Sequence, residues 1–192
     1  MVFSCSKTKV NNQLEEVDIL CCNTPSATIL IQPYGNFTKQ EINKFISELQ
    51  NNMDEFLYGE WNIKVLEPKQ IPFSSVTSNK YKALDFLNYQ KSNNKFNEVT
   101  VGITHEDICK DLHGVKNYGI VGLSFCPGNN IIVSDKRLRH KEQLWKPIIH
   151  EFMHAFYGAK HCPKDDPTCF MVDAKGHGNF SIQNKLCDSC KN

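Results

Sequence analysis

The stretch that decides how this chain folds and works runs from residue 150 to residue 162 and reads HEFMHAFYGAKHC. If this stretch is helical, His150 and His154 lie one turn apart on the same face, so both imidazoles can reach one metal ion. Glu151 then lies beside that ion. The spacing predicts a metal site built on a helix.

His161 is the natural third ligand of such a site. A helix cannot return it to the same ion unless the helix ends and the chain turns, and Gly158 permits this because glycine adopts the left-handed conformation without penalty. Three imidazoles suit zinc in an open tetrahedral site whose fourth position holds water. Glu151 would act as the general base that takes a proton from this water as it attacks a carbonyl carbon.

A buried helix whose histidines are satisfied core residues is the alternative, because HExxH alone is only moderately specific. The residues that follow favour the metal site. A glycine and a third histidine come after the second one, and Met171 follows that third histidine by ten residues. Together these features come close to the metzincin string of catalytic residues.

The chain resembles the archaemetzincins, a family of zinc-dependent metallopeptidases in which HExxHxxGxxHC is followed by CxM and then by a terminal CxxC. These elements correspond here to His150–Cys162, Cys169–Met171 and Cys187–Cys190. Upstream, the segments VTVGITHEDIC, GIVGLSF and IIVSDKRL resemble the central strands of the family. In metzincins a strand of this region forms the edge that binds the substrate as an added strand.

The resemblance implies a catalytic zinc ion held by His150, His154 and His161, with Glu151 as the base. It implies that Met171 forms the Met-turn, a structural floor beneath the metal. One departure bears on the third ligand: the glycine comes one residue late, so the string reads HExxHxxxGxxH. An extra helical residue rotates the turn by about 100 degrees, which a bulge or a shifted cap must absorb.

Four of the nine cysteines surround this region: Cys162, Cys169, Cys187 and Cys190. Their CxxC spacing is more typical of a metal site than of disulfides. A second, structural zinc ion would connect the loop after the third histidine to the C-terminus, and the resemblance implies the same ion. Two disulfides or a redox CxxC are the alternatives. Cys109 and Cys126 fall in apolar surroundings, where we expect small buried hydrophobic residues.

The composition of the 192 residues, 40% hydrophobic and 22% charged, is typical of a soluble single-domain protein. The net charge of +1 gives no drive toward nucleic acid or a membrane surface. The one basic cluster, KRLRHK at 136–141, is better explained as a solvated turn than as a binding patch. The charge makes a zinc-ribbon protein that binds nucleic acid a weaker alternative. The expected partner is a peptide or protein substrate, and we expect a monomer.

Residues 1–25 show no periodicity and predict a flexible tail ahead of a domain at 26–192. The tail has no signal peptide and the chain has no membrane-spanning stretch, so the chain as it stands predicts a cytoplasmic protein. Alternatively, Val2 to Cys5 resemble the end of a bacterial lipoprotein signal. In that case Cys5 would be acylated and the true start would lie upstream.

Apolar runs and alternation predict strands at 27–32, 61–65, 99–103, 119–125 and 130–134. Thr38 and Glu41 form a capping box that predicts a helix closed by Gly59, and a second helix is expected at 80–90. Pro147 predicts that the catalytic helix either starts at 146–147 or is kinked there, and a start is the easier case because proline suits the first helical turn. HEDIC at 105–109 carries Cys109 where a second histidine would be needed, so we expect His105 and Glu106 in a loop. A short last helix is expected to run into Cys187.

These patterns predict an α/β (α+β) metzincin-like single domain: a mixed, twisted sheet backed by helices, a catalytic helix, and a cysteine-clamped C-terminal loop. The predicted function is zinc-dependent hydrolysis of peptide bonds with Glu151 as base. The alternative is a non-catalytic zinc-binding module. In that case the position of Gly158, one residue later than in the family string, would keep His161 away from the metal.

Overall fold

The structure, a computed structural model, describes residues 24–77, 79–91, 97–112, 114–173 and 180–191. The predicted tail at 1–25 lies almost wholly outside these residues, as do Cys5, Cys21 and Cys22, so the predictions made for it stay predictions. Among the helices described, none combines the length and the apolar character needed to cross a bilayer.

Strands and helices are mixed in the first half of the chain, a run of strands follows, and a helix comes last. In chain order they are β1 Ser26–Tyr34, α1 Lys39–Phe56, β2 Glu60–Val65, β3 Lys80–Lys82, α2 Ala83–Lys91, β4 Glu98–Thr104, β5 Asp107–Leu112, β6 Val115–Ile120, β7 Gly122–Ser124, β8 Asn130–Ser134, a 3-10 turn Lys141–Leu144 and α3 Trp145–Tyr157. The predicted mixture of strands and helices is confirmed.

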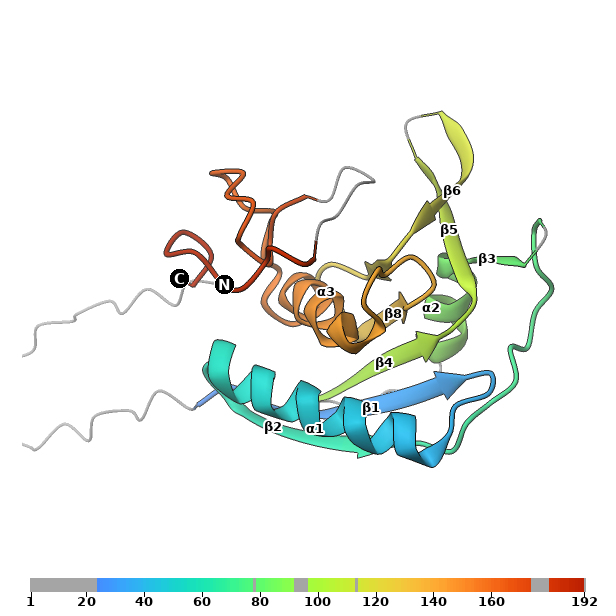
Figure 1. Ribbon diagram of the computed structural model, residues 1–192, viewed down its shortest axis with the longest axis horizontal. Coiled ribbons are helices and arrows are strands. Elements are labelled where there is room, and N and C mark those ends of the chain that lie inside the picture. Colours follow the sequence, from blue (N-terminus) through green and yellow to red (C-terminus); the bar gives the residue numbers. More distant parts are fainter. Residues whose placement is uncertain (1–23, 78, 92–96, 113, 174–179, 192) are drawn as a thin grey trace, which may run out of the picture.

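The main sheet has five strands in the order β2-β1-β4-β8-β7 (Figure 1). The first four are parallel to one another, and β7 runs antiparallel to β8 at the edge. A second, three-stranded sheet has the order β3-β5-β6. The fold is therefore the predicted α/β type with a mixed sheet, and the second sheet is an addition that the sequence did not predict.

Helices cover both faces of the main sheet. On one face, α1 and α3 pack over Ile29, Val101 and Ile131, which belong to the larger of two hydrophobic clusters. On the opposite face, α2 packs near β8 and buries Phe86 beside Ile132 in the smaller cluster. The central strands are apolar on both sides because each face is covered. This arrangement holds α3 across the sheet close to its β7 edge.

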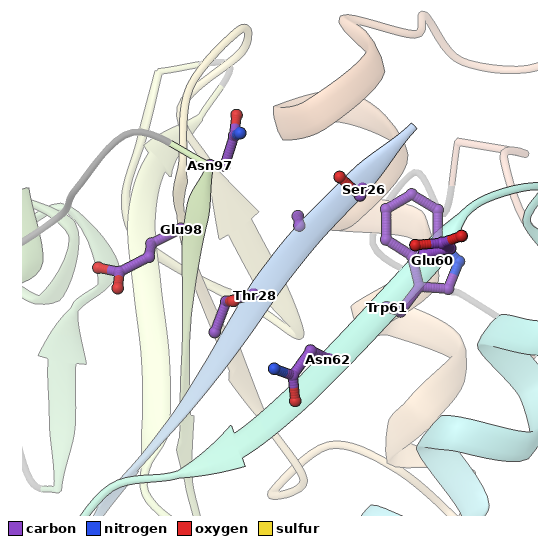
Figure 2. A pocket seen from close by; sticks show the side chains of 8 residues that line it. Ser26, Thr28, Glu60, Trp61, Asn62, Asn97 and Glu98 are labelled. Atoms are coloured by element: carbon purple, nitrogen blue, oxygen red, sulfur yellow. The ribbon is translucent and has the colours of Figure 1, made fainter. Parts of the chain in front are cut away.

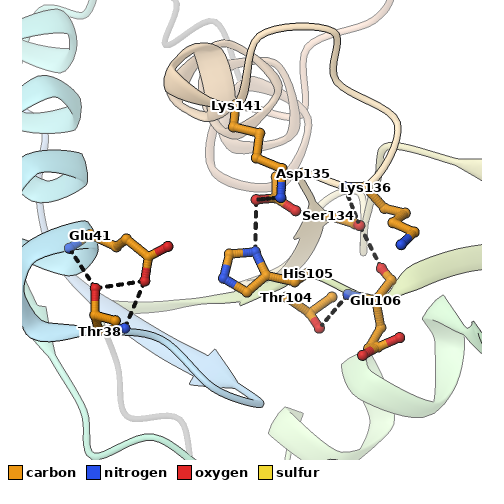
Figure 3. Close-up of polar contacts among 9 residues, drawn as sticks. All are labelled: Thr38, Glu41, Thr104, His105, Glu106, Ser134, Asp135, Lys136 and Lys141. Carbon is orange, nitrogen blue, oxygen red and sulfur yellow. Dashed lines mark hydrogen bonds and ion pairs between the residues drawn. The ribbon is translucent and has the colours of Figure 1, made fainter.

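The capping box at the start of α1 is confirmed. The Glu41 amide donates to Thr38 Oγ1 at 3.2 Å, and the Thr38 amide donates to Glu41 Oε2 at 2.8 Å (Figure 3). The predicted end at Gly59 is wrong, because the helix stops at Phe56 and Leu57 caps it in an extended conformation. Gly59 has another role: a Cβ there would come within 2.1 Å of the Trp61 ring.

Two other element predictions are corrected. The helix expected at 80–90 begins only at Ala83, because residues 80–82 form β3 and pair with β5. The single strand expected at 119–125 is split into β6, which pairs with β5, and β7, which pairs with β8. In the first case pairing with β5, which is distant in sequence, overrides the helical pattern. In the second case the chain passes from one sheet to the other between β6 and β7.

The HEDIC segment covers the bend after β4 and the first three residues of β5. His105 and Glu106 lie in the bend, as predicted. The His105 ring stacks on Phe37 with centroids 4.0 Å apart, and its Nδ1 lies 2.7 Å from Asp135 Oδ2 (Figure 3). These contacts give His105 a structural role at the carboxyl ends of the parallel strands.

The basic cluster at 136–141 makes contacts within the chain. Arg137 donates two hydrogen bonds to the Asp107 carboxylate, at 2.6 and 2.7 Å. Lys141 Nζ lies 3.3 Å from Asp135 Oδ2, and Leu138 is buried. Part of the cluster's charge is thus balanced internally.

The chain after α3 is held by turns and tertiary contacts. The short helix predicted to run into Cys187 is not found among residues 180–191. Instead, the buried Lys146 donates to the carbonyls of Phe180 and Gln183, each at 2.6 Å, and Cys169 forms a parallel bridge with Lys185. A lysine at the start of α3 therefore anchors the C-terminal segment against that helix.

Candidate metal centres

The helix α3 ends where the sequence predicts. Pro147 lies in its first turn, and Gly158 takes a left-handed conformation at φ 63° and ψ 22° just after Tyr157. The Gly158 and Ala159 amides both donate to the carbonyl of Met153, which closes the last turn of the helix. The chain can then fold back toward the histidines on the exposed side of the helix.

This turn brings the three predicted histidines together. One ring nitrogen from each of His150, His154 and His161 lies within 4.8 Å of the other two. The ring centroids are 4.6 Å apart for His150 and His154 and 4.7 Å apart for His154 and His161. The extra residue before Gly158 is absorbed by the cap, and His161 reaches the cluster.

The distance between the facing nitrogens fits a shared zinc ion. His150 Nε2 and His154 Nε2 are 3.1 Å apart. Two nitrogens bound at about 2.0–2.1 Å to a tetrahedral zinc ion would be separated by about 3.3 Å. Two imidazole lone pairs this close repel each other unless a cation or a proton lies between them.

The second nitrogen of each helical histidine is fixed by a backbone carbonyl. His150 Nδ1 lies 2.7 Å from the Phe170 oxygen, and His154 Nδ1 lies 2.6 Å from the Ala159 oxygen. Because a carbonyl only accepts, each Nδ1 carries the proton and donates it, which leaves Nε2 with its lone pair directed at the cluster. This is the tautomer that a zinc ligand needs.

Burial keeps these two imidazoles neutral. Desolvation lowers the pKa of His150 from 6.5 to about 4 and also lowers the pKa of His154. His161 differs, because its side chain is 48% exposed and its Nδ1 lies 4.0 Å from Asp173 Oδ2, which is beyond hydrogen-bond range. The cluster therefore has two half-buried members and one at the surface, so it is open on one side.

Glu151 points from α3 toward the edge strand β7. Its residue is 9% exposed, and Ser124 Oγ donates to its Oε2 at 2.6 Å. Burial raises the pKa of the Glu151 carboxyl, whereas the hydrogen bond from Ser124 opposes that rise because it stabilises the ionised form. No pattern in the sequence pointed to Ser124, since its contact arises only when β7 and α3 pack together.

The four predicted cysteines form a second cluster. The sulfur atoms of Cys162, Cys169, Cys187 and Cys190 all lie within 4.8 Å of one another. Cys187 Sγ is 3.6 Å from both Cys162 Sγ and Cys190 Sγ. Disulfide sulfurs lie about 2.05 Å apart, whereas thiolates bound at about 2.3 Å to a tetrahedral zinc ion lie about 3.8 Å apart. The geometry fits a shared metal ion and not disulfides.

The two clusters are connected through the same short segments. Cys162 follows His161 directly, and its amide donates to the Met171 carbonyl at 2.7 Å. Phe170, whose carbonyl accepts from His150, lies between Cys169 and Met171. Met171 is fully buried in the larger hydrophobic cluster; its place as a floor beneath the metal stays a prediction.

The other two cysteines within the described residues lie outside this cluster. Cys109 is buried, as predicted, on β5. Cys126 is exposed, so its predicted burial is wrong. The physical reason is that β7 ends at Ser124, and Cys126 falls in the loop before β8.

An open pocket lies elsewhere on the molecule, at the amino ends of β1 and β4 and the start of β2. Its lining includes Ser26, Thr28, Glu60, Asn62 and Asn97 (Figure 2). None of the histidines or cysteines of the two clusters lines it. The candidate chemistry is therefore concentrated at α3 and the C-terminal segment.

Comparisons with known proteins identify the fold. No protein-family profile and no curated protein sequence matches this chain. The crystal structure of archaemetzincin from Methanopyrus kandleri is similar with a TM-score of 0.69 and 21% sequence identity, covering 86% of this chain and 92% of that chain. Metalloproteinase-II from Bacteroides fragilis gives a TM-score of 0.49 and 15% identity over 88% of this chain and 51% of that one, a likeness too weak to establish a shared fold. Together with the order of strands and helices and the two clusters, the first likeness shows that this chain has the archaemetzincin fold.

Proposed function

We propose that this protein is a zinc-dependent metallopeptidase of the archaemetzincin type that hydrolyses peptide bonds in peptides or proteins. The observation that carries the proposal is the convergence of His150, His154 and His161 on one point, beside the buried carboxylate of Glu151. The fold shared with an archaemetzincin supports it independently of these distances.

His150, His154 and His161 would hold the catalytic zinc through one nitrogen each and leave a fourth position open. Zinc bound there would lower the pKa of a water molecule and polarise the peptide carbonyl. Glu151 would take the proton from the attacking water and deliver it to the leaving amine. Burial of the carboxylate suits this role, because it raises the proton affinity of the group.

The substrate would bind along β7. This strand pairs with β8 on one side and forms the edge of the five-stranded sheet on the other. An extended peptide can add to such an edge through backbone hydrogen bonds. Ser124 of β7 contacts Glu151, so a peptide placed there would lie next to the base.

The cysteine cluster would hold a second, structural zinc ion through Cys162, Cys169, Cys187 and Cys190. All four thiols come from the segment after α3, and none lies on the strands of the sheet. The alternative of a non-catalytic zinc module relied on His161 being drawn away from the metal. The distances within the histidine cluster give that alternative no support.

Removal of zinc tests the proposed function. We expect the zinc-loaded protein to cleave members of a fluorescence-quenched peptide library, to lose all cleavage after treatment with 1,10-phenanthroline, and to recover it when zinc is added back. A non-chelating isomer, 1,7-phenanthroline, serves as the control. Cleavage that survives loss of the ion would contradict the mechanism, and no cleavage across a broad library would contradict the function.

A further inference from the structure

The strand β7 accommodates the Glu151 side chain at Gly122 and binds its carboxylate at Ser124. Ser124 Oγ donates to Glu151 Oε2 at 2.6 Å, a distance typical of a hydrogen bond to an ionised acceptor. At Gly122, two residues earlier, an added Cβ would lie 2.9 Å from both Cγ and Oε1 of Glu151. Residues two apart on a strand face the same side, so Gly122 makes room for the side chain that Ser124 binds.

The contact is well placed to fix the carboxylate. Among the described residues, no second hydrogen bond to this carboxylate is found besides the one from Ser124. Glu151 lies on α3, whereas Ser124 lies on the edge strand, so the bond joins the helix that carries the histidines to the strand that would carry the substrate. Oε1 is left without this bond.

We propose that Ser124 is a positioning residue that fixes the orientation of the Glu151 carboxylate for proton transfer. Ser124 keeps its own proton and donates a hydrogen bond to Oε2. Oε1 receives the proton of the attacking water and later releases it to the leaving amine. This inference rests on the proposed peptidase function, because it assigns Ser124 to the same site.

Kinetics of three variants test the role. Ser124→Ala removes the hydroxyl, Ser124→Thr retains one, and Ser134→Ala is a matched control, since Ser134 is a buried serine on β8 that bonds to the Glu106 carbonyl. We expect Ser124→Ala to lower kcat about 10- to 100-fold, the loss expected for one hydrogen bond to a charged group. KM and zinc content should stay unchanged. Ser124→Thr should recover most of kcat, and Ser134→Ala should leave kcat unchanged.

A double-variant comparison shows whether Ser124 acts through Glu151. In the Glu151→Gln background, Ser124→Ala should cause no further loss of kcat. An equal loss in both backgrounds would overturn the proposal. So would a variant whose KM rises at constant kcat, because Ser124 would then serve substrate binding.

Crystal structures of the wild type and of Ser124→Ala separate this inference from the proposed function. We expect the Glu151 carboxylate to occupy one position against β7 in the wild type and to leave that position in the variant. This result would support the positioning role even for a protein that cleaves no peptide. A carboxylate that stays in place without the hydroxyl would overturn the positioning role, whether or not the protein is a peptidase.

Discussion

Replacing Glu151 with glutamine will lower kcat for peptide hydrolysis by at least about 100-fold, the lower end of what a general base contributes. Glutamine has nearly the shape of glutamate and can still accept the hydrogen bond from Ser124, but its amide cannot take a proton from water at neutral pH. The zinc content should stay at the wild-type value, since Glu151 belongs to neither cluster of candidate ligands. Steady-state kinetics on a cleaved library peptide, together with elemental analysis, measure both effects.

Glu106→Gln is the matched control for this variant. Glu106 also follows a histidine, His105, but lies in the bend between β4 and β5. We expect this control to retain wild-type kcat. If Glu151→Gln kept kcat within a few fold of the wild type, Glu151 would not be the base and the mechanism would be wrong.

Replacing Cys187 with serine will remove the proposed structural zinc ion and unfold the C-terminal segment. Cys187 is buried, with two sulfur neighbours at 3.6 Å, so its loss breaks the centre of the cluster. A structural zinc ion contributes about 10–16 kcal/mol in zinc-finger peptides, which is comparable to the whole stability of a typical domain. We expect one zinc ion fewer per chain, a much lower Tm, and rapid proteolysis after residue 158.

The same substitution should also reduce peptide hydrolysis. His150 donates to the carbonyl of Phe170, and His161 precedes Cys162, so both histidines depend on segments that the cysteines hold. Cys126→Ser is the control, because Cys126 is exposed and outside the cluster. An unchanged zinc content and Tm in Cys187→Ser would show that the four thiols hold no structural ion.

The parts of the fold that local chemistry determines could be predicted from the sequence. The capping box of Thr38 and Glu41 and the left-handed Gly158 each act within a few residues, so their signals lie in adjacent letters. The spacing of the histidines and cysteines likewise identified both clusters, because ligand geometry constrains which residues can share an ion.

The parts that depend on distant partners could not be predicted. Residues 80–82 have a helical pattern, but pairing with β5 makes them a strand. Whether His161 reaches the other histidines depends on backbone angles after Tyr157, which the position of one glycine does not determine. Ser124 is an ordinary strand residue in the sequence, and its contact with Glu151 exists only because α3 crosses the sheet beside β7.

The number of zinc ions per chain tests the central claim most directly. Elemental analysis should give about two zinc ions per chain for the purified wild type and about one for His154→Ala. The variant loses one of the three histidine ligands and keeps all four thiolates. About one zinc ion in both proteins would mean that the histidine cluster holds no metal, and the peptidase assignment would be contradicted.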